Sequence, residues 1–222
     1  MFLKAEEITG RHRDWPSDEF FVHHSNATRK QFADLRKLVH NNSGEKALDK
    51  YIQKNPNVLS MALKYAHTGH HGGWVIPQQI IKPKISTSNN GLIPDYIIGG
   101  KSSDGFDWWV VELKGANASI FSRTKGKLRF SHTLNEAICQ LMEYIDYCSE
   151  IQATLRDQFR LKGFREPHGL ILIGREQELD ADPQKQKLRA YWNRINGARL
   201  EIRTFDSLIR TFQTTLQMNG NL

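Results

Sequence analysis

Hydrophobic side chains recur every three or four positions near the start of the chain, which is the spacing of one buried helix face. Before residue 41 the positions with this spacing are Phe32, Leu35, Leu38 and Val39. They predict a short helix over 28–40. A second helix is predicted over 45–54, with Ser43 or a neighbouring Asn as its cap and Pro56 just beyond its end. Its inward face carries Glu45, Leu48 and Ile52.

From Trp74 onward the pattern changes to short runs rich in Val, Ile and Trp, separated by Gly, Asn and Ser, which is typical of β-strands. Strands are predicted over 75–82, 92–98, 107–114, 169–174 and 200–205. A long helix is predicted over 134–160, and two more begin at the capping positions Asp182 and Asp206. The order helix, three strands, helix, strand, helix, strand, helix indicates an α/β domain with a mixed central sheet flanked by helices.

The chain carries more basic than acidic side chains. Lys and Arg number 31 against 24 Asp and Glu, for a formal net charge of +7. This balance favours a polyanionic partner such as nucleic acid, although ordinary solubility explains it equally well. Composition alone therefore leaves the partner open.

Two cysteines and the start of the chain bear on the compartment. Cys139 and Cys148 fall nine positions apart in one predicted helix, which is about 13 Å and too far for a disulfide. The first residues lack the apolar run of a signal peptide, and no apolar run is long enough to cross a membrane. We therefore expect a cytoplasmic protein that does not enter a membrane.

Two carboxylates and a lysine stand at the ends of neighbouring predicted strands. Strand side chains alternate faces, so Glu112 and Lys114 point the same way. If the two strands form a hairpin around a turn at 99–105, Asp95 lies beside Glu112, and the two charges repel unless a cation lies between them. Oxygen ligands of this kind suit Mg²⁺ or Mn²⁺. The alternative is a Glu112–Lys114 pair that is merely solvated where the strand emerges.

Pro94-Asp95 followed by Glu112-Leu113-Lys114 resembles the signature of the PD-(D/E)xK nuclease superfamily. Gln140 and Tyr144 match the Q-x-x-x-Y motif of its RecB-like members. Within the superfamily the chain is most similar to the Shedu anti-phage nuclease domain, over about 44–210. The supporting segments are GEKALDKYIQKNPNVL, LIPDYIIGG, WWVVELKGA, QLMEY, GLILIGR and LEIRTFDSLI. The resemblance implies a restriction-endonuclease-like fold, with a nuclease domain over 44–222 and an N-terminal extension with a short helix over 1–43.

The resemblance also implies roles for individual residues. Asp95 and Glu112 would hold the metal, with the Leu113 carbonyl as a third contributor, and Lys114 would position or activate the attacking water. Glu45 would complete the site, although an acidic residue in a first helical turn is also explained by the helix dipole. The two helix residues of the Q-x-x-x-Y motif have packing as their alternative role. Gln140 is assigned to catalysis and Tyr144 to nucleic-acid binding.

A basic stretch follows the predicted catalytic strand. Between Lys114 and the long helix, the segment 115–133 contains no acidic residue and carries Arg123, Lys125, Lys127 and Arg129. Their spacing of two places all four on one side if the segment is extended. We expect them to contact the phosphates of DNA, and a solvated charged surface is the alternative.

Three histidines, His67, His70 and His71, lie in a Gly-rich segment. No cysteine or carboxylate with ligand spacing accompanies them, so an exposed loop is expected rather than a zinc site.

The function expected from these features is that of a Mg²⁺-dependent deoxyribonuclease in bacterial defence against phage. The motifs distinguish neither DNA from RNA nor cleavage within a chain from cleavage at its ends, and we expect an endonuclease acting on DNA. Similarity to Shedu implies a homo-oligomer. One rival is a catalytically silent nucleic-acid-binding module on the same fold, and another is a protein-interaction scaffold, which gives no reason for an acidic pair beside a lysine.

Overall fold

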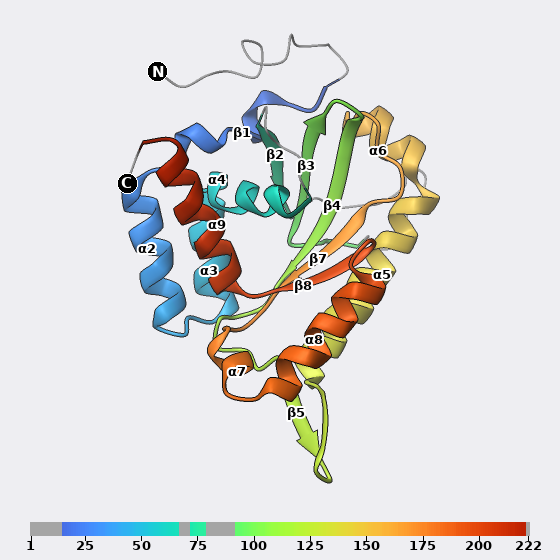
Figure 1. The fold of residues 1–222 in the computed structure, drawn as a ribbon. Coiled ribbons are helices and arrows are strands. Elements are labelled where there is room, and N and C mark those ends of the chain that lie inside the picture. Colours follow the sequence, from blue (N-terminus) through green and yellow to red (C-terminus); the bar gives the residue numbers. More distant parts are fainter. Residues whose placement is uncertain (1–14, 67–71, 79–91, 221–222) are drawn as a thin grey trace.

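The computed structural model describes residues 15–66, 72–78 and 92–220. Within these residues, six strands form one sheet in the order β1-β2-β3-β4-β7-β8 (Figure 1). Their bounds are β1 Phe21–Val22, β2 Gly73–Pro77, β3 Tyr96–Ser102, β4 Gly105–Leu113, β7 His168–Leu172 and β8 Leu200–Arg203. Neighbours from β1 to β4 are antiparallel, whereas β4, β7 and β8 are parallel. The predicted mixed sheet is confirmed, and β4 is the strand at which its two halves meet.

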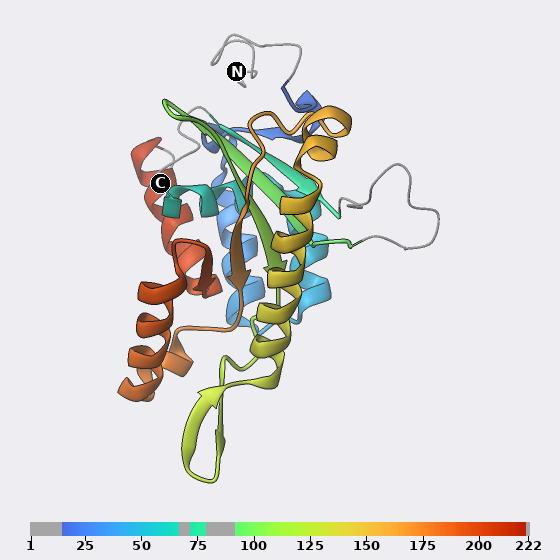
Figure 2. The ribbon, with the colours of Figure 1, turned by 90° about the vertical axis from the view of Figure 1, so that its right-hand side faces the viewer.

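Helices cover both faces of the sheet (Figures 1 and 2). One face is covered by α2 Arg29–His40, α3 Glu45–Lys54, α4 Asn57–Ser60, the 3-10 helix Met61–Ala66 and α9 Phe205–Met218. The other is covered by α5 His132–Glu150, α6 Gln152–Gln158, α7 Gln177–Asp180 and α8 Pro183–Asn196. Two apolar cores result, one on each face of the sheet.

Alternation along β4 decides which face its polar end occupies. Val111 and Leu113 pack into the core beneath α2, α3 and α9, whereas Val110 packs into the core beneath α5. Glu112 therefore lies on the α5 side of the sheet, as its parity with Val110 requires.

The two N-terminal helices are confirmed. Helix α2 begins after Thr28, whose hydroxyl accepts from the backbone N–H of Gln31 in a capping box. Helix α3 spans the predicted residues, but its N-cap is Gly44, which supplies no side chain. The predicted Ser43 cap is therefore wrong. Leu35 of α2, which precedes residue 44, and Leu48 of α3 lie in the same apolar core.

The predicted long helix over 134–160 is two helices. α5 ends at Glu150 and α6 begins at Gln152, with Ile151 between them at φ −106° and ψ 23°. Leu155 of α6 and Leu161 just beyond it are fully buried in the same core as Cys148 of α5.

A second, two-stranded sheet was not predicted. β5 Phe121–Thr124 and β6 Lys127–Phe130 form a hairpin joined by a two-residue turn. Both turn residues have positive φ, 49° at Lys125 and 76° at Gly126, which matches the twist that short hairpins favour. Because the chain reverses here, Arg123 faces away from Lys127 and Arg129, and the prediction that all four basic residues share one side is wrong.

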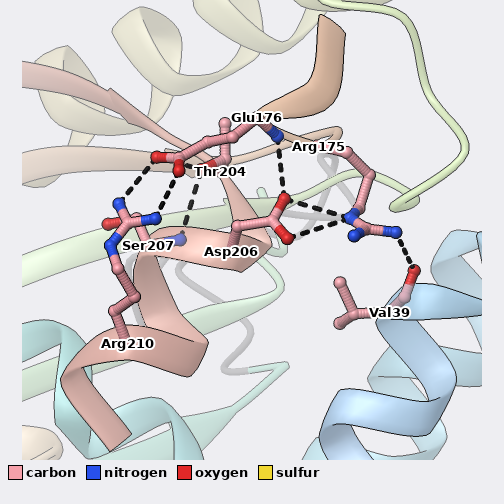
Figure 3. Close-up of polar contacts among 7 residues, drawn as sticks. All are labelled: Val39, Arg175, Glu176, Thr204, Asp206, Ser207 and Arg210. Carbon is pink, nitrogen blue, oxygen red and sulfur yellow. Dashed lines mark hydrogen bonds and ion pairs between the residues drawn. The ribbon is translucent and has the colours of Figure 1, made fainter. Parts of the chain in front are cut away.

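A polar network ties the loop after β7 to two helices (Figure 3). Arg175 Nε donates to both carboxylate oxygens of Asp206, at 3.1 and 3.0 Å, and Arg175 Nη1 donates to the Val39 carbonyl at the end of α2. Glu176 pairs with Arg210, one turn further along α9. Asp206 does not cap α9 as predicted, because Thr204 is its N-cap and the Asp206 carboxylate is taken up by Arg175.

Several smaller expectations can be scored on the described residues. Cys139 is exposed, Cys148 is buried, and both are free, as predicted. No helix among the described residues is long and apolar enough to cross a membrane. The histidines His67, His70 and His71 lie outside the described residues, as do positions 79–82 of the first predicted strand.

Candidate active site

The β3–β4 hairpin brings the two predicted metal ligands together. Tyr96 pairs with Val111, so the preceding Asp95 lies beside Glu112. The backbone N–H of Leu113 donates to Asp95 Oδ2 at 2.7 Å, which holds that carboxylate against the end of β4. The predicted hairpin is confirmed, with its turn between Ser102 and Gly105.

Lys114, directly after the end of β4, contacts side chains of both neighbouring helices. Its Nζ donates to Glu112 Oε1 at 2.6 Å and to Gln140 Oε1 of α5 at 3.4 Å. The same Nζ lies 3.8 Å from Glu45 Oε2 of α3. The structure thus brings Glu45, Glu112, Lys114 and Gln140 to one place. Glu112 is only 4% exposed, so the alternative of a solvated pair is wrong.

Burial and charge crowding oppose ionisation of the two carboxyl groups. Burial, and then the charge of Asp95, raise the pKa of Glu112 to about 7, although its hydrogen bond to Lys114 works in the other direction. Burial also raises the pKa of Asp95 above its ordinary value, against the hydrogen bond from Leu113. Additional positive charge at the site would therefore stabilise the ionised form of both carboxyl groups.

Lys114 is a cation at neutral pH. Burial by itself lowers the pKa of its ammonium group, but the hydrogen bond to Glu112 and the charges of Glu112, Glu45 and Asp95 outweigh that effect. The net result is a pKa above the ordinary lysine value. Even so, one partly buried ammonium does not offset the acidic groups around it, because the pKa of Glu112 stays raised.

Backbone contacts fix the loop that follows Lys114. The Lys114 N–H donates to Leu172 O of β7 at 2.8 Å, and the Ala116 N–H donates to Ser43 O at 2.9 Å. A Cβ atom on Gly115 would lie 2.1 Å from Asn117 Oδ1 and 3.1 Å from the Glu45 nitrogen, so a side chain here would have to displace Asn117 and crowd the start of α3. The loop thus abuts the first turn of α3, which places Glu45 near Lys114 and also near the positive end of the helix dipole.

Tyr144 of α5 contacts the backbone just before Asp95. Its hydroxyl donates to the Ile93 carbonyl at 3.3 Å. Burial, and then the charges of Glu112 and Asp95, raise the pKa of this phenol to about 12. The Tyr144 ring is half-buried at the site, and its hydroxyl contact is to the protein backbone. Its assignment to nucleic-acid binding stays a prediction.

Asp49 is a site residue that sequence reasoning missed. It lies four positions after Glu45 on α3, hence on the same helix face. Its Oδ1 accepts from the hydroxyl of buried Tyr96 at 2.6 Å, and its charge contributes to the raised pKa of Asp95. The available signal was the i, i+4 spacing of two acidic residues on one helix.

The donor set suits a hard divalent cation. Mg²⁺ commonly keeps several waters and binds proteins through one or two carboxylates. Asp95 and Glu112 supply two, and the charge of Asp95 raises the pKa of Glu112. No group of three or more His, Cys, Asp or Glu placed to hold a metal occurs among the described residues. The residues present therefore fit a cation held by two carboxylates, backbone oxygen and water rather than a closed protein cage.

The basic residues after the site lie on the β5–β6 hairpin. Arg123 Nη2 donates to Asp182 Oδ2 at 2.6 Å and to Gln184 Oε1 at 3.3 Å. Lys125, Lys127 and Arg129 are exposed. The four predicted phosphate contacts thus divide into one residue engaged with the protein and three directed to solvent.

A family model described as "Shedu protein SduA, C-terminal" matches residues 42–209, which is more than half of the chain. The matched segment contains Glu45, Asp95, Glu112, Lys114 and Gln140 together with the whole β5–β6 hairpin. No curated protein matches the chain.

Proposed function

Because this chain belongs to the family of Shedu SduA C-terminal domains, we propose that it is a metal-dependent nuclease that hydrolyses phosphodiester bonds in DNA, in defence against phage. The observation that supports this most is the state of Glu112, a buried carboxylate whose pKa is raised to about 7 beside a second carboxylate. Such an arrangement costs stability, and strongly perturbed groups of this kind cluster at functional sites.

In this proposal Asp95 and Glu112 hold Mg²⁺ or Mn²⁺. Once bound, the metal supplies a Lewis acid that polarises the phosphoryl group and lowers the pKa of water. Asp95 is kept in place by the Leu113 N–H, and through Ile93 by the Tyr144 hydroxyl. These contacts orient the first carboxylate without consuming both of its oxygens.

Lys114 stabilises negative charge that develops on the phosphate. An ammonium group has three donors, of which two reach Glu112 and Gln140. The third stays available for a phosphate oxygen or for the attacking water. Gln140 and Glu45 hold the ammonium from α5 and from α3, so both act on the reaction through Lys114.

A second candidate function is a silent nucleic-acid-binding module on the same fold. The 2.6 Å contact between Lys114 and Glu112 favours it, because an internal ammonium can stand in for a metal. Cleavage separates the two functions. The proposal also includes a homo-oligomer, which light scattering at several concentrations tests.

The direct test is cleavage of closed-circular, nicked and linear DNA with Mg²⁺, with Mn²⁺ and with EDTA. We expect cleavage only with metal, and conversion of closed circles if the enzyme is an endonuclease. Asp95→Asn, Glu112→Gln and Lys114→Met should each lower the rate by about 10²-fold or more, since each removes a charge that acts in the transition state.

Asp107→Asn is the matched control, because Asp107 is an exposed carboxylate on β4 at the end away from the site. It should cleave at the wild-type rate. Wild-type cleavage in EDTA, or by a folded Glu112→Gln variant, contradicts the mechanism. Binding of DNA without any cleavage under all metal conditions favours the silent module.

A further inference from the structure

The β5–β6 hairpin projects from the body of the molecule (Figures 1 and 2). It begins at Phe121, shortly after Lys114, so it emerges from the same end of β4 as the candidate active site. Each strand has four residues, which corresponds to an extended ribbon about 13 Å long. A basic ribbon of this size therefore follows directly on the end of β4 that carries Glu112.

The register gives the ribbon two different faces. Residues paired across an antiparallel ladder share a face, so Phe121, Arg123, Leu128 and Phe130 lie on one side. The other side carries Ser122, Thr124, Lys127 and Arg129, all of them exposed. The apolar face turns toward the protein, since Phe130 packs edge-on against Trp192 of α8 at 5.5 Å between ring centroids. The polar and basic face is left for a ligand.

The base of the ribbon is held firmly. Both carboxylate oxygens of Glu178 accept backbone hydrogen bonds, from Ile120 at 2.8 Å and from Phe121 at 3.1 Å. Further out, Arg123 pairs with Asp182, the N-cap of α8, which also accepts from the Gln184 N–H at 2.9 Å. These contacts fix the angle at which the ribbon leaves the body.

The three remaining cations of the ribbon face no acidic partner within the part of the chain that the structure describes. Among the described residues, no ion pair is formed by Lys125, Lys127 or Arg129. The segment 115–133 also contains no acidic residue. A rigid ribbon with one purely polar and basic face has the shape and charge that the major groove of B-form DNA admits, whereas a single strand offers no groove.

We propose that the hairpin enters the major groove of double-stranded DNA with its Lys127–Arg129 face, and that Arg123 positions the hairpin instead of binding phosphate. The proposal rests on the proposed function in taking DNA as the ligand. It adds that the substrate is duplex, and it assigns the Arg123–Asp182 pair to orientation.

The first test measures binding in EDTA, so that its outcome does not depend on cleavage. Anisotropy of a labelled duplex and of its single strand is recorded over a range of salt concentrations. For Lys127→Gln with Arg129→Gln, duplex affinity should fall about tenfold or more and the log–log salt slope should flatten by up to about 0.9 per lost phosphate contact. Single-strand binding should change much less.

Arg160→Gln with Arg165→Gln serves as the charge-matched control, because both arginines are exposed in the connection before β7, away from the site. It should bind duplex as the wild type does. A major-groove ligand such as methyl green should compete with the protein, and a minor-groove ligand such as distamycin should not. Equal losses on duplex and single strand, or competition by distamycin alone, overturn the groove assignment.

The second test separates orientation from charge through the sign of an effect. Asp182→Asn removes a negative charge and keeps a residue that caps helices well. If the hairpin is simply a charged surface, this change frees Arg123 and strengthens DNA binding. If the pair orients the ribbon, duplex binding weakens several-fold despite the gain in net positive charge, and Arg123→Gln weakens it similarly.

A stronger-binding Asp182→Asn variant therefore overturns the positioning role. The two proposals fail in different ways. A protein that binds duplex through the ribbon but never cleaves it retains the groove assignment and loses the nuclease assignment. A protein that cleaves, but binds duplex equally well without Lys127 and Arg129, does the reverse.

Discussion

At the scale of single residues, Glu112 carries an energetic cost that can be measured without a substrate. Burial and Asp95 raise its pKa from 4.5 to about 7. For a group whose folded pKa is raised, the stability it contributes is complete below the unfolded value and is lost as the pH rises through the folded value. The metal-free protein should thus lose stability between about pH 4.5 and pH 7 on account of this one side chain.

Glu112→Gln fixes the side chain in its uncharged form. In EDTA the variant should match the wild type near pH 4.5 and exceed it by roughly 2–3 kcal/mol near pH 8, as two pKa units or more imply. Chemical denaturation at several pH values measures this difference. A variant less stable than the wild type at pH 8 means that the Glu112–Lys114 pair is a structural ion pair.

Metal provides an internal check on that measurement. A ligand that binds only the folded state stabilises it by about 2.7 kcal/mol at a hundredfold excess over its Kd. Millimolar Mn²⁺ should therefore raise the melting temperature of the wild type and raise that of Glu112→Gln much less.

Sequence reasoning found the residues whose geometry follows from one strand or one helix. Alternation along β4 placed Glu112 and Lys114 together, and the short hairpin brought Asp95 to them. Asp49 and Arg175 escaped it, because their roles depend on partners contributed by other elements. No local period encodes a contact across two layers of the fold.

At the scale of elements, α5 reaches the site twice, one turn apart. Gln140 contacts Lys114, and Tyr144 contacts the backbone before Asp95. Tyr144→Phe removes one hydrogen bond and should cost about 1 kcal/mol of stability. If the hydroxyl positions Asp95, cleavage should slow while DNA affinity stays unchanged. An affinity loss with an unchanged rate at saturating DNA would instead support the predicted nucleic-acid contact.

The elements themselves were predictable to different degrees. The helices α2 and α3 were placed correctly because their apolar stripes are uninterrupted and Pro56 limits the second. The β5–β6 hairpin could not be placed from side-chain spacing, because its turn depends on two residues with positive φ, Lys125 and Gly126. Glycine at the second turn position was the signal, and lysine is an unusual residue at the first.

At the scale of the whole molecule, the network around Arg175 connects the N-terminal helices to the C-terminal part of the chain (Figure 3). The Arg175 and Asp206 side chains are only 12% and 18% exposed. Asp206→Asn leaves a largely buried guanidinium without its counter-charge and should lower the free energy of unfolding by about 2–4 kcal/mol. Denaturant titration measures the change.

Replacing both partners, as Arg175→Met with Asp206→Leu, should recover part of that loss, since no charge is left unpaired. The exposed pair Arg199–Glu166 is the control, and Glu166→Gln should cost less than about 1 kcal/mol. Equal costs at the two pairs would show that the Arg175 network is no more than a surface feature.

Because β4 lies between the two halves of the sheet, its two partner strands are made at different times during synthesis on the ribosome. Its antiparallel partner β3 comes just before it in the chain, so the two carboxylates can approach early. The backbone of Lys114 is held by Leu172 of β7, which is translated only after the hairpin and both helices of the α5–α6 segment. Domains fold as units, so a nascent chain that stops short of β7 carries Asp95, Glu112 and Lys114 but lacks the hydrogen-bond partner of the Lys114 backbone. The candidate site is therefore complete only after this parallel strand has been made.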